Sequence, residues 1–137
     1  MFLGTYKTYL SGKNERGTTS YRIILPKKFR KELGSEDKIY IFLGIQGEIW
    51  GFNIEQWRKE AESRLKIPLS EEKGREERRE FFPRTEECVL DSQGRFILPK
   101  EFVAQAKLKE VLLVGAGDHF EIWNPKKWQQ VIANAKI

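Results

Sequence analysis

The sequence predicts a β-rich α+β fold built from two pseudo-symmetric repeats with short helices. The first observation is a duplicated phrase, RIILPKKF at residues 22–29 and RFILPKEF at 95–102, which agrees at six of eight positions at a spacing of 73. The match continues downstream, where residues 52–57 correspond to 123–128 at a spacing of 71. Stretches of β-branched and aromatic residues follow each copy of the phrase, and these are typical of strands.

Each half is expected to begin with a short apolar strand that meets a turn and continues over 22–25 or 95–98, where a proline stops it. Because proline donates no amide hydrogen bond and suits the first position of a helix, Pro26 and Pro99 predict short helices over 27–33 and 100–107. Gly34 supplies a stop for the first of these helices.

Two further strands and a closing helix are expected in each half. The strands are predicted over 38–43 and 48–52 in the first half and over 110–114 and 119–123 in the second. The closing helices contain Trp57 and Trp128. We expect the tryptophans, together with Phe29 and Phe102, to pack in the core rather than to stack on bases.

The duplication divides the chain into a first repeat (1–66), a helical linker (67–86) and a second repeat (87–137). One half is small for an independent core, so we expect the repeats to share one compact domain. The linker helix is expected to start at Ser70, with Phe81 and Phe82 anchoring its end to the core.

Composition favours a soluble, cytoplasmic protein. The 137 residues are 39% hydrophobic and 33% charged, and no run approaches the roughly 18 apolar residues of a membrane span. The start of the chain lacks the apolar stretch of a secretory leader. Cys88, the single cysteine, is expected to be a packed thiol, and His119, the single histidine, to have a structural role rather than to bind a metal. We therefore expect no metal, cofactor or small-molecule substrate, and no enzyme, since no nucleophile–base set or phosphate-binding glycine loop is present in the sequence.

The positive charge is concentrated near the start. Residues 1–35 carry eight Lys or Arg against two Glu, whereas the remaining residues carry seventeen against eighteen acidic residues. Such a segment suits a polyanion such as nucleic acid, although a solvated basic face has the same composition.

The motif Asp91-Ser92-Gln93-Gly94-Arg95 carries the clearest chemistry of the chain. An aspartate four residues before an arginine, with a glycine between them, suits a tight hairpin in which the carboxylate accepts amide hydrogen bonds and braces the guanidinium. A braced arginine can bind phosphate or read guanine in the major groove. The alternative is an Asp–Arg pair that only pins the turn.

This motif, together with the start MFLG and the run GAGDHFEIW at 115–123, resembles the MraZ family of the wider AbrB-like (SpoVT-AbrB) group over essentially the whole chain. The resemblance implies a double-split or swapped-hairpin β-barrel. It also implies a regulator, often a repressor, that binds repeated sites in double-stranded DNA upstream of a division and cell-wall gene cluster. Self-assembly into ring-like homo-oligomers and a nucleoid location follow from the same resemblance.

The resemblance assigns DNA contact to Arg95, with Asp91 and Gly94 bracing the motif. The first copy departs from the pattern, because Leu10 to Arg22 spans twelve steps where Leu90 to Arg95 spans five, and Thr18 stands where Asp91 is expected. We expect Arg22 rather than Arg16 to take the role of the motif arginine.

The longer first loop is expected to contact phosphate through a flexible backbone, with Lys13 and Arg16 as cations. Lys27 and Lys100, which follow the repeated prolines, are further candidates for DNA contact. For the loop, the alternative is a solvated polar insertion that has no role in binding. For the two helix lysines, the alternative is a solvated helix face. For the whole chain, the alternative functions are an antitoxin-like module and a structural protein-interaction module, and the short apolar end after Trp128 disfavours the former.

Overall fold

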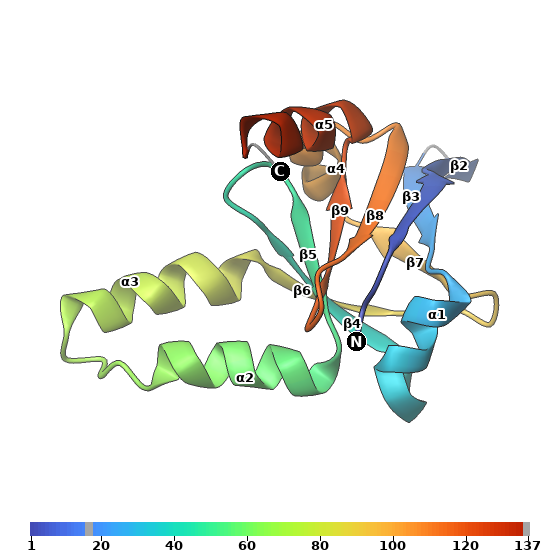
Figure 1. Ribbon diagram of the computed structural model, residues 1–137. Helices are drawn as coiled ribbons and strands as arrows, with labels where there is room; N and C mark the ends of the chain where they lie inside the picture. The colour runs from blue at the N-terminus through green and yellow to red at the C-terminus, as the bar shows by residue number, and fades with distance from the viewer. Residues whose placement is uncertain (16–17, 136–137) are drawn as a thin grey trace.

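The computed structural model describes residues 1–15 and 18–135, and it has the expected strand-rich α+β class (Figure 1). All strand pairs are antiparallel. The larger sheet has the order β1 (Thr5–Tyr9), β8 (Glu110–Gly115), β9 (Phe120–Trp123), β5 (Ile49–Phe52), β4 (Lys38–Leu43), β6 (Thr85–Val89). The smaller sheet has the order β2 (Ser11–Glu15), β3 (Thr18–Ile24), β7 (Arg95–Leu98).

Both sheets contain strands of both halves. β1 pairs with β8, β5 with β9, β4 with β6 and β3 with β7, so each of these pairs joins the first half to the second. The main core between the sheets draws on both halves. Its fully buried members include Phe29, Ile41, Phe96 and Phe120.

The closed barrel implied by the family resemblance is not present in the described part of the chain, because both sheets are open. β1 and β6 are the two edges of the larger sheet and do not pair with each other. The chain instead runs from each edge strand into the smaller sheet, through Leu10 to β2 and through the turn after Leu90 to β7.

The repeated prolines precede their helices by one residue. The helices are α1 (Lys27–Arg30) with the 3-10 turn η1 (Lys31–Glu36), α2 (Ile54–Leu65), α3 (Glu72–Phe81) with the 3-10 turn η2 (Phe82–Arg84), α4 (Lys100–Ala106) and α5 (Pro125–Asn134). Pro26 and Pro99 are the N-caps of α1 and α4, not their first residues, and their carbonyls accept the first helical amides. Gly34, at φ 73° and ψ −152°, interrupts the first helical segment as expected.

Helices cover the outer face of the larger sheet. α2 and α3 form an antiparallel hairpin that projects from the sheets, whereas α5 packs on β8 (Figure 1). The linker helix α3 starts at Glu72 instead of Ser70, and its last residue, Phe81, is buried against Phe42 and Ala61, with Phe82 packed beside them. This cluster is separate from the main core.

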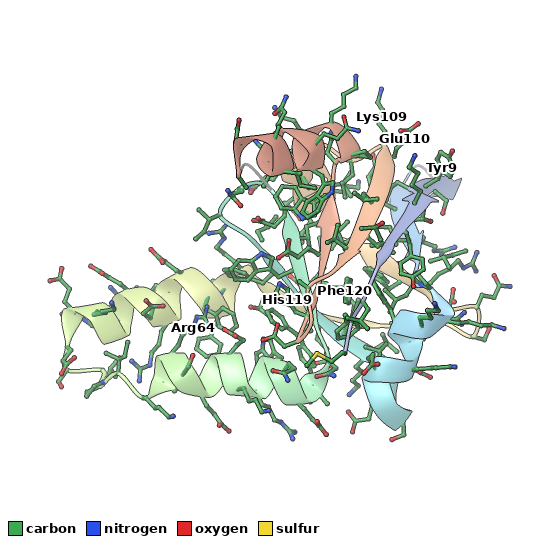
Figure 2. All side chains as sticks on the ribbon, in the orientation of Figure 1. Tyr9, Arg64, Lys109, Glu110, His119 and Phe120 are labelled. Atoms are coloured by element: carbon green, nitrogen blue, oxygen red, sulfur yellow. The ribbon has the colours of Figure 1, made fainter. Side chains whose placement is uncertain are left out.

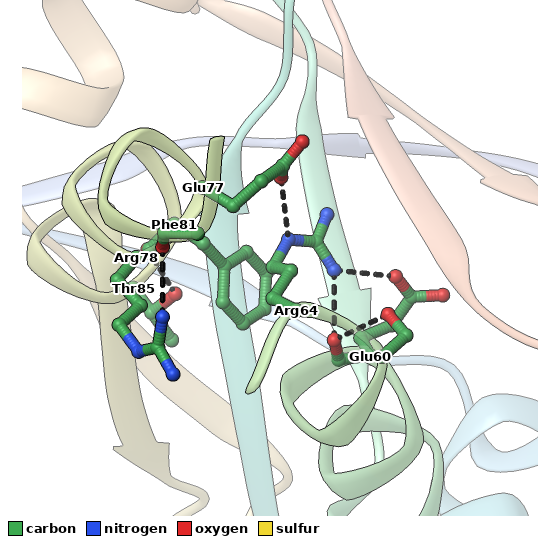
Figure 3. Close-up of polar contacts among 8 residues, drawn as sticks. Glu60, Arg64, Glu77, Arg78, Phe81 and Thr85 are labelled. Atoms are coloured by element: carbon green, nitrogen blue, oxygen red, sulfur yellow. Dashed lines mark hydrogen bonds and ion pairs between the residues drawn. The ribbon is translucent and has the colours of Figure 1, made fainter. Parts of the chain in front are cut away.

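A cation over an aromatic ring ties the hairpin together. The Arg64 guanidinium lies 3.9 Å from the centroid of Phe81 and donates to the carbonyl and the carboxylate of Glu60, while Glu77 lies 3.8 Å away (Figure 3). The α2–α3 hairpin is therefore held together by contacts gathered around Arg64.

Candidate nucleic-acid interface

The β3–β7 pair brings the two motif arginines to one face of the smaller sheet. The register places Arg22 opposite Ile97 and Ile24 opposite Arg95. Residues directly opposite each other in an antiparallel pair share a face, and so do residues two apart on one strand. Arg22 and Arg95 therefore occupy diagonal positions on the same face, with Cα atoms about 7–8 Å apart.

This face is accessible whereas the opposite face belongs to the core. Ile24 and Ile97 are 50% and 52% exposed, while Ile23 and Phe96, which lie between the other residues on the two strands, are 0% and 1% exposed. The Arg95 side chain is 30% exposed. We call the surface formed by Arg22, Ile24, Arg95 and Ile97 the arginine face.

The Asp91 carboxylate organises the turn that leads into β7. Its Oδ1 accepts the amides of Gln93 at 2.9 Å and Arg95 at 3.0 Å, and its Oδ2 accepts the Arg95 Nε at 3.0 Å. The backbone closes the same turn, because the Gly94 amide donates to the Asp91 carbonyl at 3.0 Å and the Asp91 amide donates to the Arg95 carbonyl at 2.8 Å. Asp91 thus holds the guanidinium of Arg95 at one nitrogen, and among the residues that the structure describes no further partner of this guanidinium is found, so its other nitrogens can act as donors.

These contacts favour the ionised form of Asp91. Hydrogen bonding from the Arg95 amide, together with that from the Gln93 amide and the Arg95 side chain, outweighs desolvation and holds the pKa of Asp91 below its ordinary value. The Asp91–Arg95 ion pair is therefore intact at neutral pH.

Gly94 lets a second arginine approach the turn. Its φ of 78° lies in the left-handed region that favours glycine, and a Cβ built there would lie 2.5 Å from the Nη1 of Arg30. The Gly94 carbonyl also accepts the Leu25 amide at 2.9 Å, which ties the turn to the end of β3. Arg30 itself is half-buried against the motif turn.

The first-repeat segment is a hairpin instead of the flexible loop expected from the sequence. β2 pairs with β3 from Ser11 opposite Arg22 to Glu15 opposite Thr18. The expectation was wrong because β2 is polar and glycine-containing and lacks the apolar alternation by which strands are recognised. Arg16 lies outside the described residues, as do the side chains of Lys13 and Thr18.

The remaining predicted cations flank the arginine face along the chain. Lys27 and Lys100 begin α1 and α4, each three residues after the isoleucine of its strand, and both are exposed. The elements Arg22–Ile24–Lys27 and Arg95–Ile97–Lys100 are therefore equivalent in the two repeats.

His119 lies away from the arginine face, next to Phe120 between the larger sheet and the helical hairpin (Figure 2). Its ring contacts Asp118 Oδ1 at 2.7 Å and Glu121 Oε2 at 2.8 Å and stacks on Phe52. Burial lowers the pKa of His119, but the hydrogen bonds with Glu121 and Asp118 outweigh burial and raise the pKa above its ordinary value. In residues 1–15 and 18–135, no group of three or more His, Cys, Asp or Glu is placed to hold a metal.

Sequence reasoning missed Ile24 and Ile97 as members of this surface. In the phrase Arg-Ile-Ile-Leu every residue after the arginine is apolar, so the exposed position cannot be distinguished from the buried ones. The available signal was the Arg-x-Ile spacing common to both repeats.

The fold and the site define a two-repeat α+β protein with paired arginines on one accessible sheet face. One known protein family matches both halves of the chain. The model of the MraZ protein family, described as antitoxin-like, matches residues 1–80 and again 81–137. The boundary between the two matches falls inside the segment expected as the linker.

Curated relatives cover nearly the whole chain. "Transcriptional regulator MraZ" of Caldicellulosiruptor saccharolyticus is 33% identical over all of this chain and 90% of its own length. The proteins of the same name from Clostridium acetobutylicum and Lactiplantibacillus plantarum are 35% and 36% identical, over 93% and 95% of this chain and 84% and 86% of their own lengths. The chain belongs to the MraZ family. Among the described helices, none has the length and apolar character needed to cross a membrane.

Proposed function

We propose that this chain is a sequence-specific DNA-binding transcriptional regulator, whose arginine face binds repeated promoter sites. The observation that carries the proposal is the diagonal placement of Arg22 and Arg95 on one accessible face of the β3–β7 pair. A two-stranded β-ribbon fits the major groove, and arginine is the side chain that most often reads guanine there.

The bracing of Arg95 supports a role in readout. A guanidinium fixed by Asp91 at Nε loses less conformational entropy on binding than a free surface arginine, while its remaining donors can make a bidentate contact. Lys27, Lys100 and the β2–β3 hairpin with Lys13 and Arg16 would add phosphate contacts, which set affinity rather than sequence preference.

One arginine face offers few base contacts, so we propose that several copies act together as a ring-like homo-oligomer. Joined subunits raise the effective local concentration at spaced repeats. The printed names of the relatives support transcription regulation. The family resemblance adds repression of a division and cell-wall gene cluster at the nucleoid.

We also infer that the two repeats, 1–66 and 87–137 with the linker 67–86, form one folding unit related to the swapped-hairpin barrels. The pairing of strands from one half with strands from the other in both sheets supports this inference.

The proposal is tested by binding of the full chain to a duplex carrying the spaced repeats of its own division-cluster promoter, and to a scrambled duplex, over a salt series. We expect a preference for the promoter duplex of at least 1,000-fold at physiological salt, the low end for specific regulators. Equal affinities for the promoter and scrambled duplexes, with the same steep salt dependence, would show that the surface binds polyanions without sequence preference. Assembly without salt-sensitive DNA affinity would favour the protein-interaction alternative.

A further inference from the structure

Two isoleucines on the arginine face are exposed without an evident structural reason. Ile24 and Ile97 lie at 50% and 52% exposure on strands whose neighbouring positions, Ile23 and Phe96, are almost fully buried. They are equivalent in the two repeats, and each stands directly opposite the motif arginine of the other repeat. An apolar side chain flanked by cations is thus presented twice on one small surface.

We propose that Ile24 and Ile97 contact the C5-methyl groups of thymines in the major groove, next to the bases read by Arg22 and Arg95. The proposal rests on the DNA-binding function proposed above. The thymine methyl is the apolar group that the major groove offers, and apolar side chains recognise it. The register places each isoleucine directly opposite an arginine. When the arginine enters the major groove, the isoleucine therefore enters it as well and lies close to the base edges.

Charge favours DNA over a second copy of the chain as the occupant of this face. Two copies meeting through the same patch would bring Arg22 and Arg95 of both chains together, and like charges across an interface cost free energy. A duplex instead supplies negative charge to the arginines and methyl groups to the isoleucines.

The test removes one methyl group at a time from the DNA. A duplex is first selected from a random pool by the full wild-type chain, and each thymine in it is then replaced by deoxyuridine, which keeps base pairing and loses the methyl. We expect wild-type affinity to fall about 3- to 5-fold at one or more thymines, as burial of a single methyl group predicts. Ile24→Ala or Ile97→Ala should bind the thymine duplex more weakly by a similar factor and should no longer distinguish thymine from deoxyuridine at its own position.

Ile45→Ala is the matched control, because Ile45 is 89% exposed in the turn between β4 and β5. It should retain wild-type affinity and the wild-type response to deoxyuridine. Thermal unfolding of all three variants verifies that they are folded.

The outcomes separate the two proposals. If no deoxyuridine weakens wild-type binding, or if both isoleucine variants keep the full response, the methyl contacts are refuted while sequence-specific binding stands. If the variants bind DNA as the wild type does but change the sedimentation mass, the isoleucines contact a second copy and the inference is overturned. If the wild type enriches no sequence, DNA recognition itself fails and the inference fails with it.

Discussion

The Nε of Arg95 lies 3.0 Å from the Oδ2 of Asp91, and the other oxygen of the same carboxylate accepts the Arg95 amide. One acidic side chain therefore fixes both the backbone and the guanidinium of the residue that we propose reads DNA. This double hold makes Asp91 a positioning residue on a surface where a negative charge would otherwise repel DNA.

Replacement of Asp91 by asparagine should weaken DNA binding although it removes a negative charge. The amide nitrogen of asparagine cannot accept the Arg95 Nε, so the guanidinium loses its brace. We expect a several-fold loss of affinity for the promoter duplex, measured by fluorescence anisotropy. Glu86→Gln, which neutralises an exposed acid on β6, should bind at least as tightly as the wild type. If both variants gained affinity equally, the Asp91–Arg95 pair would have no role in recognition.

Replacement of Gly94 by alanine should destabilise the fold by about 1–3 kcal/mol, because its φ of 78° disfavours a Cβ and Arg30 occupies the space. Gly47→Ala is the control, since Gly47 has φ 87° but its nearest neighbour would be 3.9 Å from the added Cβ. Urea unfolding of Gly94→Ala, Arg30→Ala and the double variant gives the coupling free energy. A Gly94→Ala cost equal to that of Gly47→Ala, with no coupling to Arg30, would exclude the close approach.

Cys88 should be inert in the native protein. It is buried, and burial, followed by the nearby charges of Glu86 and Glu87, raises the pKa of its thiol to about 12. Because the thiolate is the reactive form, a thiol reagent at neutral pH should label the chain only when it unfolds. Rapid stoichiometric labelling of the folded chain, followed by absorbance, would contradict the buried placement.

Stability should fall as the pH rises from mildly acid to alkaline values. The pKa of His119 is raised in the folded state, so protonated His119 stabilises the fold fully below its unfolded pKa, about 6.5. This contribution is lost as the pH rises through the folded pKa. Urea unfolding between about pH 5 and pH 9 should show the decline for the wild type and a smaller one for His119→Gln. Parallel curves for the two proteins would remove His119 as the source.

The duplicated phrase predicted much of this architecture. The strands after each phrase, the helices after Pro26 and Pro99 and the anchoring of Phe81 follow from local patterns of apolar residues and breakers. The pairing of β3 with β7 does not follow from such local patterns, because register between distant strands depends on the packing of both sheets. The polar strand β2 was missed for a different reason, because it shows no apolar alternation.

The site was predictable only in part. The contacts of Asp91 within its own turn could be predicted, because they depend only on the spacing of residues inside the motif 91–95. The placement of Arg22 beside Arg95, the exposure of Ile24 and Ile97 and the approach of Arg30 to Gly94 depend on the tertiary fold. Apart from the Arg-x-Ile spacing that both repeats share, the sequence carries no pattern that separates these residues from others of the same type.

The central claim, that Arg22 and Arg95 read DNA from one face, is tested most directly by the affinities of Arg22→Ala, Arg95→Ala and Arg79→Ala for the promoter duplex and its scrambled counterpart. Arg79 is exposed on α3, so Arg79→Ala removes the same charge away from the arginine face. The account predicts that each arginine-face variant loses about 1–3 kcal/mol of binding free energy on the promoter duplex, with a smaller loss on the scrambled one. Equal and small losses for all three variants on both duplexes would contradict it.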